Sequence, residues 1–410
     1  MNRYINNIHI NKVRHLKDIN IPLEKDAYPH LMITGKNGSG KTSLLNAIAD
    51  HIERIANDIH KEFENYEKRI EYWENELKNN PQNILSTEQS LQWNKDQYKL
   101  FFGEIILTFR DVDTLIKKYQ EGNFIIAFYK AQRTIKKLQE TKNPTKPTLQ
   151  HKWGINQPAI QEFLNFLSDL KIQEALARNE KLETEANKIN EWFVNFEQRL
   201  GKIFQDEKLK LAFNYKDYSF KIVTDGKEFK FTELSDGFAA VLDIIVDLIL
   251  KMQDKNELTR AYEREGIVLV DEIETHLHLE LQKVIMPLLI EIFPNIQFIV
   301  TTHSPFVLSS LSNAVAFDLE HQQVIEDLTE YSYESLAEGY FGVKTASSYI
   351  EMQLNRLKEL LEKETLSSSE KSELKHLNSD FEEVPEIVSP VIKGSYLQLK
   401  NQYFQKIKAL

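Results

Sequence analysis

The chain contains no cysteine, and this absence removes several kinds of chemistry at once. Disulfide bonds, zinc sites built on thiolates and cysteine nucleophiles are all excluded. A cysteine-free chain without a recognisable secretion signal fits a reducing compartment, so a cytoplasmic location is expected.

Long apolar runs and excess positive charge are also missing. The most apolar segment, 239–250, is too short to span a bilayer and carries Asp243 and Asp247, so no membrane association is expected. Lysine and arginine number 51 against 62 aspartates and glutamates, which gives a net charge of −11. An acidic chain does not attract nucleic acid through its overall field, although a local basic patch still can. A nucleotide or protein partner is therefore expected before free DNA.

The patterning that is present predicts a folded protein of mixed α/β class. Hydrophobic residues make up 41% of the chain and charged residues 28%, which is typical of globular domains. A heptad-like stripe predicts one helix from Ser43 to Asn79, and capping-box spacing from Ser86 to Gln89 predicts the start of a returning helix. Strand and helix patterns then alternate; strands are expected at 4–34, 104–109, 124–129 and 208–231, and helices at 155–204 and beyond 330.

Residues 35–42 read GKNGSGKT and match the phosphate-binding pattern G-x-x-x-x-G-K-[ST]. An apolar strand precedes them and a helix follows, which is the context that this motif requires. Lys41 is expected to neutralise the β- and γ-phosphates of ATP, and Thr42 to ligate Mg²⁺. The nucleotide contacts are expected from seven consecutive residues: Asn37, Gly38, Ser39, Gly40, Lys41, Thr42 and Ser43.

A second motif begins with the apolar run 267–270 and ends in Asp271 and Glu272. Two carboxylates at the end of a buried strand are typical of a Walker B motif. Asp271 is then the expected Mg²⁺ ligand, and Glu272 is placed to accept a proton from the attacking water or to orient it.

Two further motifs gain meaning from their order along the chain. Residues 234–238 read LSDGF directly before an amphipathic helix, and residues 298–305 read FIVTTHSP and deliver His303 from a strand into a loop. The order resembles that of ABC-type ATPases of the SMC-like branch. The resemblance implies that Ser235 and Gly237 belong to a signature loop that grips the γ-phosphate of another subunit. It also implies that His303 is the switch histidine and that 274–278 is the D-loop.

The tracts GIVLVDEIETHLH and FIVTTHSP resemble bacterial ATPases of phage-defence and retron systems, including Septu-type ATPases and the ATPase half of overcoming-lysogeny-defect nucleases. This resemblance implies an ABC-type head with a mixed central sheet, flanking helices and an antiparallel β subdomain. It implies a homodimer or higher homo-oligomer. The head is expected in segments 1–49, 101–135 and 205–330, with a helical hairpin at 50–100, a helical insertion at 136–204 and a helical partner-binding region at 331–410.

Some residues depart from the motifs of ABC-type ATPases, and others allow more than one interpretation. The signature continues as Phe238-Ala239-Ala240, without the polar residue of many relatives. Gln132, just after a strand, is the candidate Q-loop residue, or simply a polar surface residue. His276 and His278 invite a metal interpretation, but they lie two residues apart in an expected loop without further ligands nearby.

The relatives with built-in nucleases carry a Toprim domain, whose metal site needs an Asp-x-Asp pair. No such pair follows residue 305. A nuclease or toxin effector is therefore expected in trans, and nucleic acid would be reached through that complex. The alternative is an SMC-like DNA-repair ATPase that binds nucleic acid directly. A basic stripe of Lys136, Lys137, Lys142 and Lys146 would favour it, although such a run is usually a solvated segment.

The C-terminal region is expected to form an αα-hairpin from about Ala346 to Phe381, followed by an aromatic tail. Such a hairpin with its aromatic tail is not expected to bury all of its apolar side chains alone. It would pack on the ATPase head, on the helical hairpin or on a partner effector.

Overall fold

The computed structural model describes residues 4–23, 30–57, 60–79, 84–131, 145–253, 264–311, 313–325, 348–383 and 390–408. The chain divides into two compact units, Met1–Tyr333 and Glu334–Leu410. Four residues singled out in the sequence, Gln132, Lys136, Lys137 and Lys142, lie outside the described residues.

A six-stranded sheet forms the centre of the first unit, with strand order β12-β11-β3-β10-β9-β5. All neighbours pair in parallel except β11 and β12, which are antiparallel. The central strands are buried apolar runs, as is typical of a parallel sheet covered on both faces. The strands are β3 (His30–Thr34), β5 (Phe124–Tyr129), β9 (Glu265–Val270), β10 (Ile296–Thr301), β11 (Ala314–Asp318) and β12 (Gln323–Ile325).

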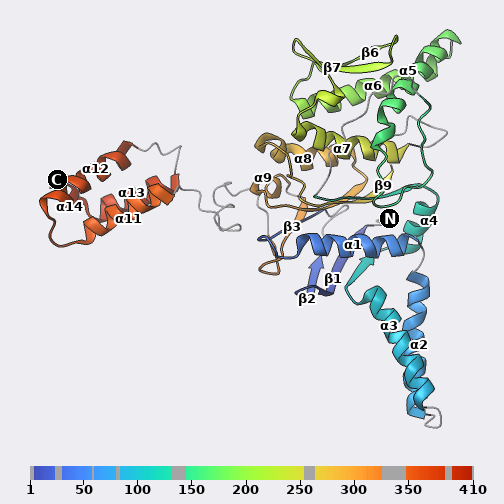
Figure 1. The fold of residues 1–410 in the computed structure, drawn as a ribbon, viewed down its shortest axis with the longest axis horizontal. Coiled ribbons are helices and arrows are strands. Elements are labelled where there is room, and N and C mark those ends of the chain that lie inside the picture. The colour runs from blue at the N-terminus through green and yellow to red at the C-terminus, as the bar shows by residue number, and fades with distance from the viewer. Residues whose placement is uncertain are drawn as a thin grey trace. The chain divides into compact units, whose positions relative to one another are not determined.

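A second sheet, of order β2-β1-β4, is entirely antiparallel. It consists of β1 (Ile5–Val13), β2 (Leu16–Pro22) and β4 (Ile105–Phe109). Helix α1 (Lys41–Ala56) lies between this sheet and the six-stranded one (Figure 1). Apolar side chains of α1 and of both sheets share one buried cluster, so the helix that follows the phosphate-binding loop is fixed on both sides.

The opposite face of the six-stranded sheet is covered by helices α7 (Asp236–Met252) and α8 (Leu279–Ile292) (Figure 1). Beyond them lie α5 (Phe163–Asn179) and α6 (Glu183–Phe204), and then a three-stranded antiparallel sheet. That sheet comprises β6 (Lys210–Asn214), β7 (Ser219–Thr224) and β8 (Lys227–Lys230). The predicted mixed sheet, flanking helices and antiparallel β subdomain are thus confirmed. Short elements complete the unit: α4 (Val112–Gln120), η2 (Ile160–Glu162), η3 (Phe231–Glu233) and α9 (Pro305–Leu308).

Helices α2 (His60–Asn79) and α3 (Ile84–Phe102) pack along each other as a hairpin (Figure 1). The prediction of one helix from Ser43 to Asn79 is wrong, because α1 ends at Ala56. Asn57 is its C-cap, with φ of −88° and ψ of 13°, and its side chain donates to the carbonyl of Glu53 at 2.9 Å. The predicted cap at Ser86 is also wrong: α3 begins at Ile84, so Ser86 lies within its first turn.

The second unit consists of helices α11 (Ser348–Glu362), α12 (Ser368–Glu383), α13 (Pro390–Gln402) and α14 (Phe404–Lys408). The predicted capping box is present, since Ser367 and Glu370 each bind the other's backbone N–H. Much of the predicted hairpin and its aromatic tail packs within the unit, whereas Met352, Leu397 and Phe404 remain exposed. Side chains of α13 complete a core within the unit; its buried members are Leu357, Leu360, Leu361, Leu374, Leu377, Phe381, Ile392 and Tyr396. Among the described residues no helix is long and apolar enough to cross a membrane.

Candidate functional site

The loop between β3 and α1 has the backbone of a phosphate-binding loop. Gly35, Gly38 and Gly40 have φ of 135°, 85° and 99°, in the left-handed region that glycine adopts without steric cost. Lys41 Nζ donates to the carbonyls of Gly35 and Lys36 at 2.8 and 3.0 Å, which folds the side chain back over the loop. Helix α1 begins at Lys41, so its positive dipole end faces the same loop.

The carboxyl ends of the parallel strands β3, β9 and β10 meet at one edge of the sheet and bring distant motifs together. Asp271 Oδ1 accepts hydrogen bonds from Thr42 Oγ1 at 3.2 Å and from Thr301 Oγ1 at 2.6 Å. The N–H of Glu272 donates to the same Thr301 hydroxyl at 2.8 Å. Thr301 therefore fixes both acidic residues of the second motif; it lies within the motif at 298–305, which by itself assigns it no role.

Glu272 has a backbone conformation that is rare for residues with a side chain. Its φ is 46°, in the left-handed region that costs a non-glycine residue of order 1 kcal/mol or more. Such strain persists where neighbouring contacts hold the residue in place. Two hydroxyls make these contacts here: that of Thr301 accepts the N–H of Glu272, and that of Thr275 donates to Glu272 Oε2 at 3.4 Å. The strained turn directs the carboxylate of Glu272 into the pocket.

His303 follows β10 in a short loop that ends at α9. Its N–H donates to Glu274 Oε1 at 2.6 Å, and Ser304 caps α9 through the N–H groups of Phe306 and Val307. Burial lowers the pKa of the His303 imidazole, and the nearby Lys41 ammonium lowers it further. The neutral ring is thus favoured, which leaves one nitrogen as donor and one as acceptor.

Burial also shifts the pKa of two charged groups beside this histidine. It lowers the pKa of the Lys41 ammonium, an effect opposed by Glu272 and Glu274. It raises the pKa of the Glu274 carboxyl, although the His303 N–H donated to it acts in the opposite direction. The surrounding carboxylates favour the charged form of the Lys41 side chain, which can bind an anionic ligand.

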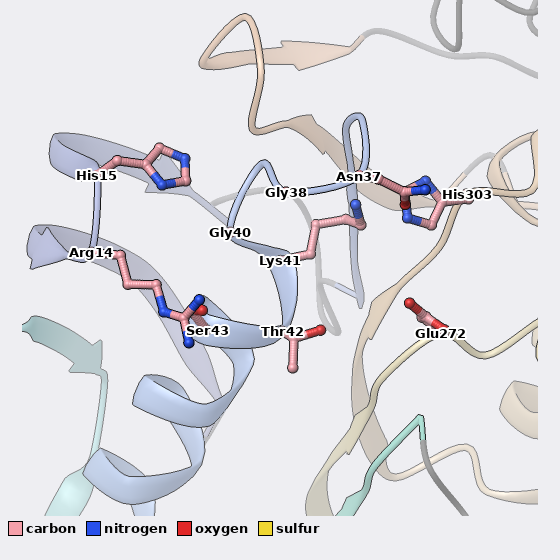
Figure 2. Close-up of a pocket in the computed structure, with 10 residues that line it drawn as sticks. All are labelled: Arg14, His15, Asn37, Gly38, Gly40, Lys41, Thr42, Ser43, Glu272 and His303. Carbon is pink, nitrogen blue, oxygen red and sulfur yellow. The ribbon is translucent and has the colours of Figure 1, made fainter.

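These residues surround a pocket of about 250 Å³ (Figure 2). Figure 2 shows the phosphate-binding loop and Lys41 in the middle, with Glu272 and His303 on one side and Arg14 and His15 on the other. The last two come from the β1–β2 turn, and His15 Nε2 lies 3.2 Å from the carbonyl of Ser39. No motif in the sequence marks these two residues, because their turn reaches the pocket only through sheet packing. The other lining residues are Asn37, Gly38, Gly40, Thr42 and Ser43.

The predicted signature residues do not line this pocket. Ser235 is exposed at the N-cap of α7, and its hydroxyl makes no capping hydrogen bond. Gly237 is buried against the D-loop: a Cβ there would lie 2.9 Å from the carbonyl oxygen of His276. The signature loop and the D-loop of one chain are therefore in contact.

Two other sequence-based expectations have different outcomes. Gln132, the candidate Q-loop residue, lies outside the described residues. His276 and His278 are both exposed, and within the described ranges no group of three or more histidine, aspartate or glutamate side chains could hold a metal ion.

The fold and the phosphate-binding loop define a P-loop ATPase of the ABC/SMC-like class. The chain belongs to the family described as "AAA domain, putative AbiEii toxin, Type IV TA system", which matches residues 31–309. The match extends from strand β3 to the end of α9, and so includes all the motifs found in the sequence.

The chain is also similar to named proteins and to solved structures. The Septu protein PtuA of Bacillus mycoides (strain KBAB4) is 24% identical over 423 residues, which cover 99% of this chain and 54% of that protein. The Retron Vc95 probable ATPase of Vibrio cholerae serotype O1 biovar El Tor is 37% identical over 99 residues, 24% of this chain and 17% of that protein. The predicted resemblance to Septu and retron ATPases is thereby confirmed.

The chain spans about half the length of the Septu relative and less of the retron one. A crystal structure of the Smc head bound to the C-winged helix domain of ScpA matches with a TM-score of 0.39 and 14% identity. The match covers 78% of this chain and 97% of that one.

Proposed function

We propose that this protein hydrolyses ATP at a site completed by the signature loop of a second copy, and that this cycle controls a partner effector in anti-phage defence. The observation that carries the proposal is that the predicted signature residues do not line the pocket of their own chain. Lys41, Glu272 and His303 line it, whereas Ser235 lies exposed elsewhere with a hydroxyl that makes no capping bond. A helix N-terminus with an uncommitted serine is suited to a phosphate held by another molecule.

Within the pocket, each residue has a role that its position supports. Lys41 would leave the loop carbonyls and pair with the β- and γ-phosphates of ATP. Glu272, directed inward by its strained backbone, would orient the attacking water and accept its proton. His303, favoured in its neutral form, would hydrogen-bond the γ-phosphate.

Thr42 and Asp271 would hold Mg²⁺, which when bound neutralises charge on the phosphates. Their oxygens already converge to 3.2 Å, and hydroxyl and carboxylate oxygens are the ligands that Mg²⁺ prefers. The buried Ser39 hydroxyl in the adjoining loop has no hydrogen-bond partner, as expected of a loop shaped for a polar ligand.

The dimer is tested by sedimentation of the Glu272→Gln variant with and without ATP. This substitution keeps the shape of the side chain and removes its basicity, so ATP should bind, persist and hold two copies together. Ser235→Arg should leave nucleotide binding unchanged but abolish both turnover and ATP-induced association. Ser372→Arg, at an exposed serine of the second unit, is the matched control and should behave as wild type.

Two outcomes would contradict the proposal. If Glu272→Gln hydrolyses ATP at the wild-type rate, Glu272 is not the base. If ATP leaves the association state unchanged while hydrolysis proceeds, the site is complete within one chain.

The defence role rests on the names of the relatives, a Septu protein and a retron ATPase. The effector, a nuclease or toxin, would act in trans and dock on the second unit. That unit has its own core, yet Met352, Leu397 and Phe404 remain 62%, 43% and 52% exposed. Aromatic and methionine side chains are favoured in interfaces. Removal of residues 334–410 should abolish co-purification of products of neighbouring genes and preserve ATP hydrolysis; retained co-purification would place docking on the ATPase unit.

A further inference from the structure

Glu274 lies in the D-loop, three residues beyond the expected Mg²⁺ ligand Asp271, and has had no role so far. Its Oε1 accepts the backbone N–H of His303 at 2.6 Å. Its own carbonyl accepts the N–H of Leu277 at 2.9 Å, which closes the turn that carries it. The D-loop and the histidine loop, 29 residues apart, are therefore joined by this one side chain.

The loop around His303 is held on either side by other contacts. The N–H of Thr302 donates to the carbonyl of Ile33 at 3.0 Å, and the N–H of Ser304 donates to the Thr302 hydroxyl at 3.0 Å. The Ser304 hydroxyl in turn donates to Gln282 Oε1 at 2.7 Å. These bonds fix the ends of the loop, and the bond from Glu274 acts on the amide of the histidine itself.

Glu274 is not among the residues that line the pocket, whereas His303 is. A carboxylate that accepts a backbone N–H makes a short, strong hydrogen bond, because the acceptor is charged. The position of the backbone fixes the direction of the Cα–Cβ bond, and so limits where the imidazole of His303 can lie. Glu274 is therefore suited to act on the pocket through His303.

We propose that Glu274 is a positioning residue of the ATPase site, which fixes the loop of His303 so that its imidazole faces the γ-phosphate. This inference rests on the proposed function, since it gives His303 its role there. It also links the D-loop of each chain to the nucleotide site of that same chain.

The first test compares two substitutions of the full chain in steady-state ATP hydrolysis. Glu274→Ala removes the acceptor and should lower kcat about tenfold or more, as small displacements of catalytic groups do. The KM for ATP and the affinity for nucleotide should change by less than about threefold, because uniform binding is untouched. Glu274→Gln keeps a carbonyl oxygen at the same place and should recover most of kcat. Glu280→Ala, at an exposed glutamate that pairs with Lys283, is the matched control.

The second test asks whether Glu274 acts through the histidine. In a His303→Ala background, Glu274→Ala should cause no further loss of kcat, because the group that it positions is already absent. Independent, multiplied losses would overturn the inference, and so would a Glu274→Ala variant whose nucleotide affinity falls in step with kcat.

Failure of the proposed function would look different. If His303→Ala itself turns over normally, the histidine has no role in hydrolysis. If the wild-type chain does not hydrolyse ATP, the enzymatic proposal fails as a whole.

Discussion

Thr42 Oγ1 and Asp271 Oδ1 lie 3.2 Å apart although 229 residues separate them in the chain. Thr42 lies in the first turn of the helix after the phosphate-binding loop, and Asp271 directly follows strand β9. The fold therefore brings a hydroxyl and a carboxylate together beside the pocket of Lys41 and Glu272.

The first prediction concerns this pair. Asp271→Asn should lower Mg²⁺-dependent hydrolysis by about a hundredfold or more, because a neutral amide stabilises the metal and the developing charge much less. ATP binding measured in the presence of a chelator should survive. The same substitution at Asp217, an exposed residue of the β6–β7 turn, should have no effect. Equal Mg²⁺ dependence in Asp271→Asn and wild type would remove Asp271 from the metal site.

A second prediction concerns Arg14, which lines the pocket from the β1–β2 turn. Arg14→Ala should weaken nucleotide binding about tenfold, since a charged hydrogen bond contributes about 1.5 kcal/mol or more. Titration with a fluorescent ATP analogue measures this. Arg14→Lys retains the charge but loses the forked donor geometry, so its affinity for the nucleotide should lie between those of the wild type and Arg14→Ala. Unchanged affinity in Arg14→Ala would mean that this side of the pocket does not contact the nucleotide.

A third prediction follows from His30, at the start of β3. The residue is 2% exposed, its Nδ1 accepts the N–H of Phe298, and burial lowers its pKa to about 4. In the unfolded chain the imidazole of His30 therefore binds a proton below about pH 6.5, whereas in the folded chain it binds one only below about pH 4. The contribution of His30 to the free energy of unfolding should be complete above this range, and the free energy of unfolding should fall by about 3 kcal/mol as the pH drops through it.

Urea unfolding at several pH values measures that change. His30→Gln keeps an acceptor for Phe298 and does not titrate, so this component of the pH dependence should disappear. If the variant and the wild type lose stability equally between pH 6.5 and 4, His30 is not its source.

A fourth prediction concerns a buried ion pair in α7. Asp247 accepts Lys251 Nζ at 2.9 Å and the Tyr129 hydroxyl at 2.7 Å, and both charged side chains are almost fully buried. Asp247→Ala should cost about 3–5 kcal/mol, because it leaves a buried ammonium unpaired. Asp247→Asn combined with Lys251→Met should recover most of this loss in urea unfolding. A double variant no more stable than Asp247→Ala would show that the carboxylate, not the unpaired ammonium, determines stability.

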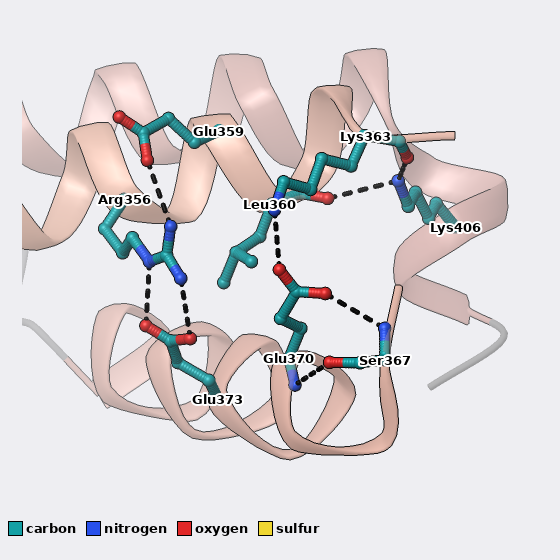
Figure 3. Close-up of polar contacts among 8 residues, drawn as sticks. All are labelled: Arg356, Glu359, Leu360, Lys363, Ser367, Glu370, Glu373 and Lys406. Atoms are coloured by element: carbon teal, nitrogen blue, oxygen red, sulfur yellow. Dashed lines mark hydrogen bonds and ion pairs between the residues drawn. The ribbon is translucent and has the colours of Figure 1, made fainter. Parts of the chain in front are cut away.

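A fifth prediction concerns the second unit and its capping box (Figure 3). Ser367→Ala should destabilise α12 by about 1 kcal/mol, since it leaves the N–H of Glu370 without its acceptor. Ser372→Ala, inside the same helix, should be neutral or slightly stabilising. Thermal unfolding of residues 334–410, followed by circular dichroism, compares them. Equal melting temperatures for the two variants would mean that the hydrogen bond from Glu370 to Ser367 does not stabilise the unit.

The same unit should also lose stability in acid. Hydrogen bonds from Lys363 and Ser367 lower the pKa of Glu370 to about 2 (Figure 3). A depressed carboxyl pKa adds stability that is complete above the unfolded value and disappears as the pH falls through the folded one. The melting temperature of the unit should therefore fall from about pH 4.5 towards pH 2, and it should fall less in Glu370→Gln.

The central residues of the candidate site could be predicted from the sequence. Lys41, Thr42, Asp271 and Glu272 could be chosen because phosphate binding and Mg²⁺ ligation need particular residue types at short spacings, and such spacings are visible in a linear string. The strands were predictable for a similar reason, since a buried strand is an unbroken apolar run. Helix ends were predicted less well: α1 ends at Ala56 and is capped by Asn57, although the apolar stripe of the sequence continues beyond it.

The other residues of the site follow from the packing of the whole fold. Arg14 lies in no motif, and Thr301 and Glu274 lie within motifs that assign them no role, because ordinary arginines, threonines and glutamates acquire such roles through strand register and loop packing. The second unit shows the same limit. The apolar stripe of its hairpin predicts which side chains are buried but not what they pack against, and Ile392 and Tyr396 of α13 complete the core. Spacing along the chain fixes local chemistry, whereas contacts between distant segments depend on the free energy of the whole packed fold.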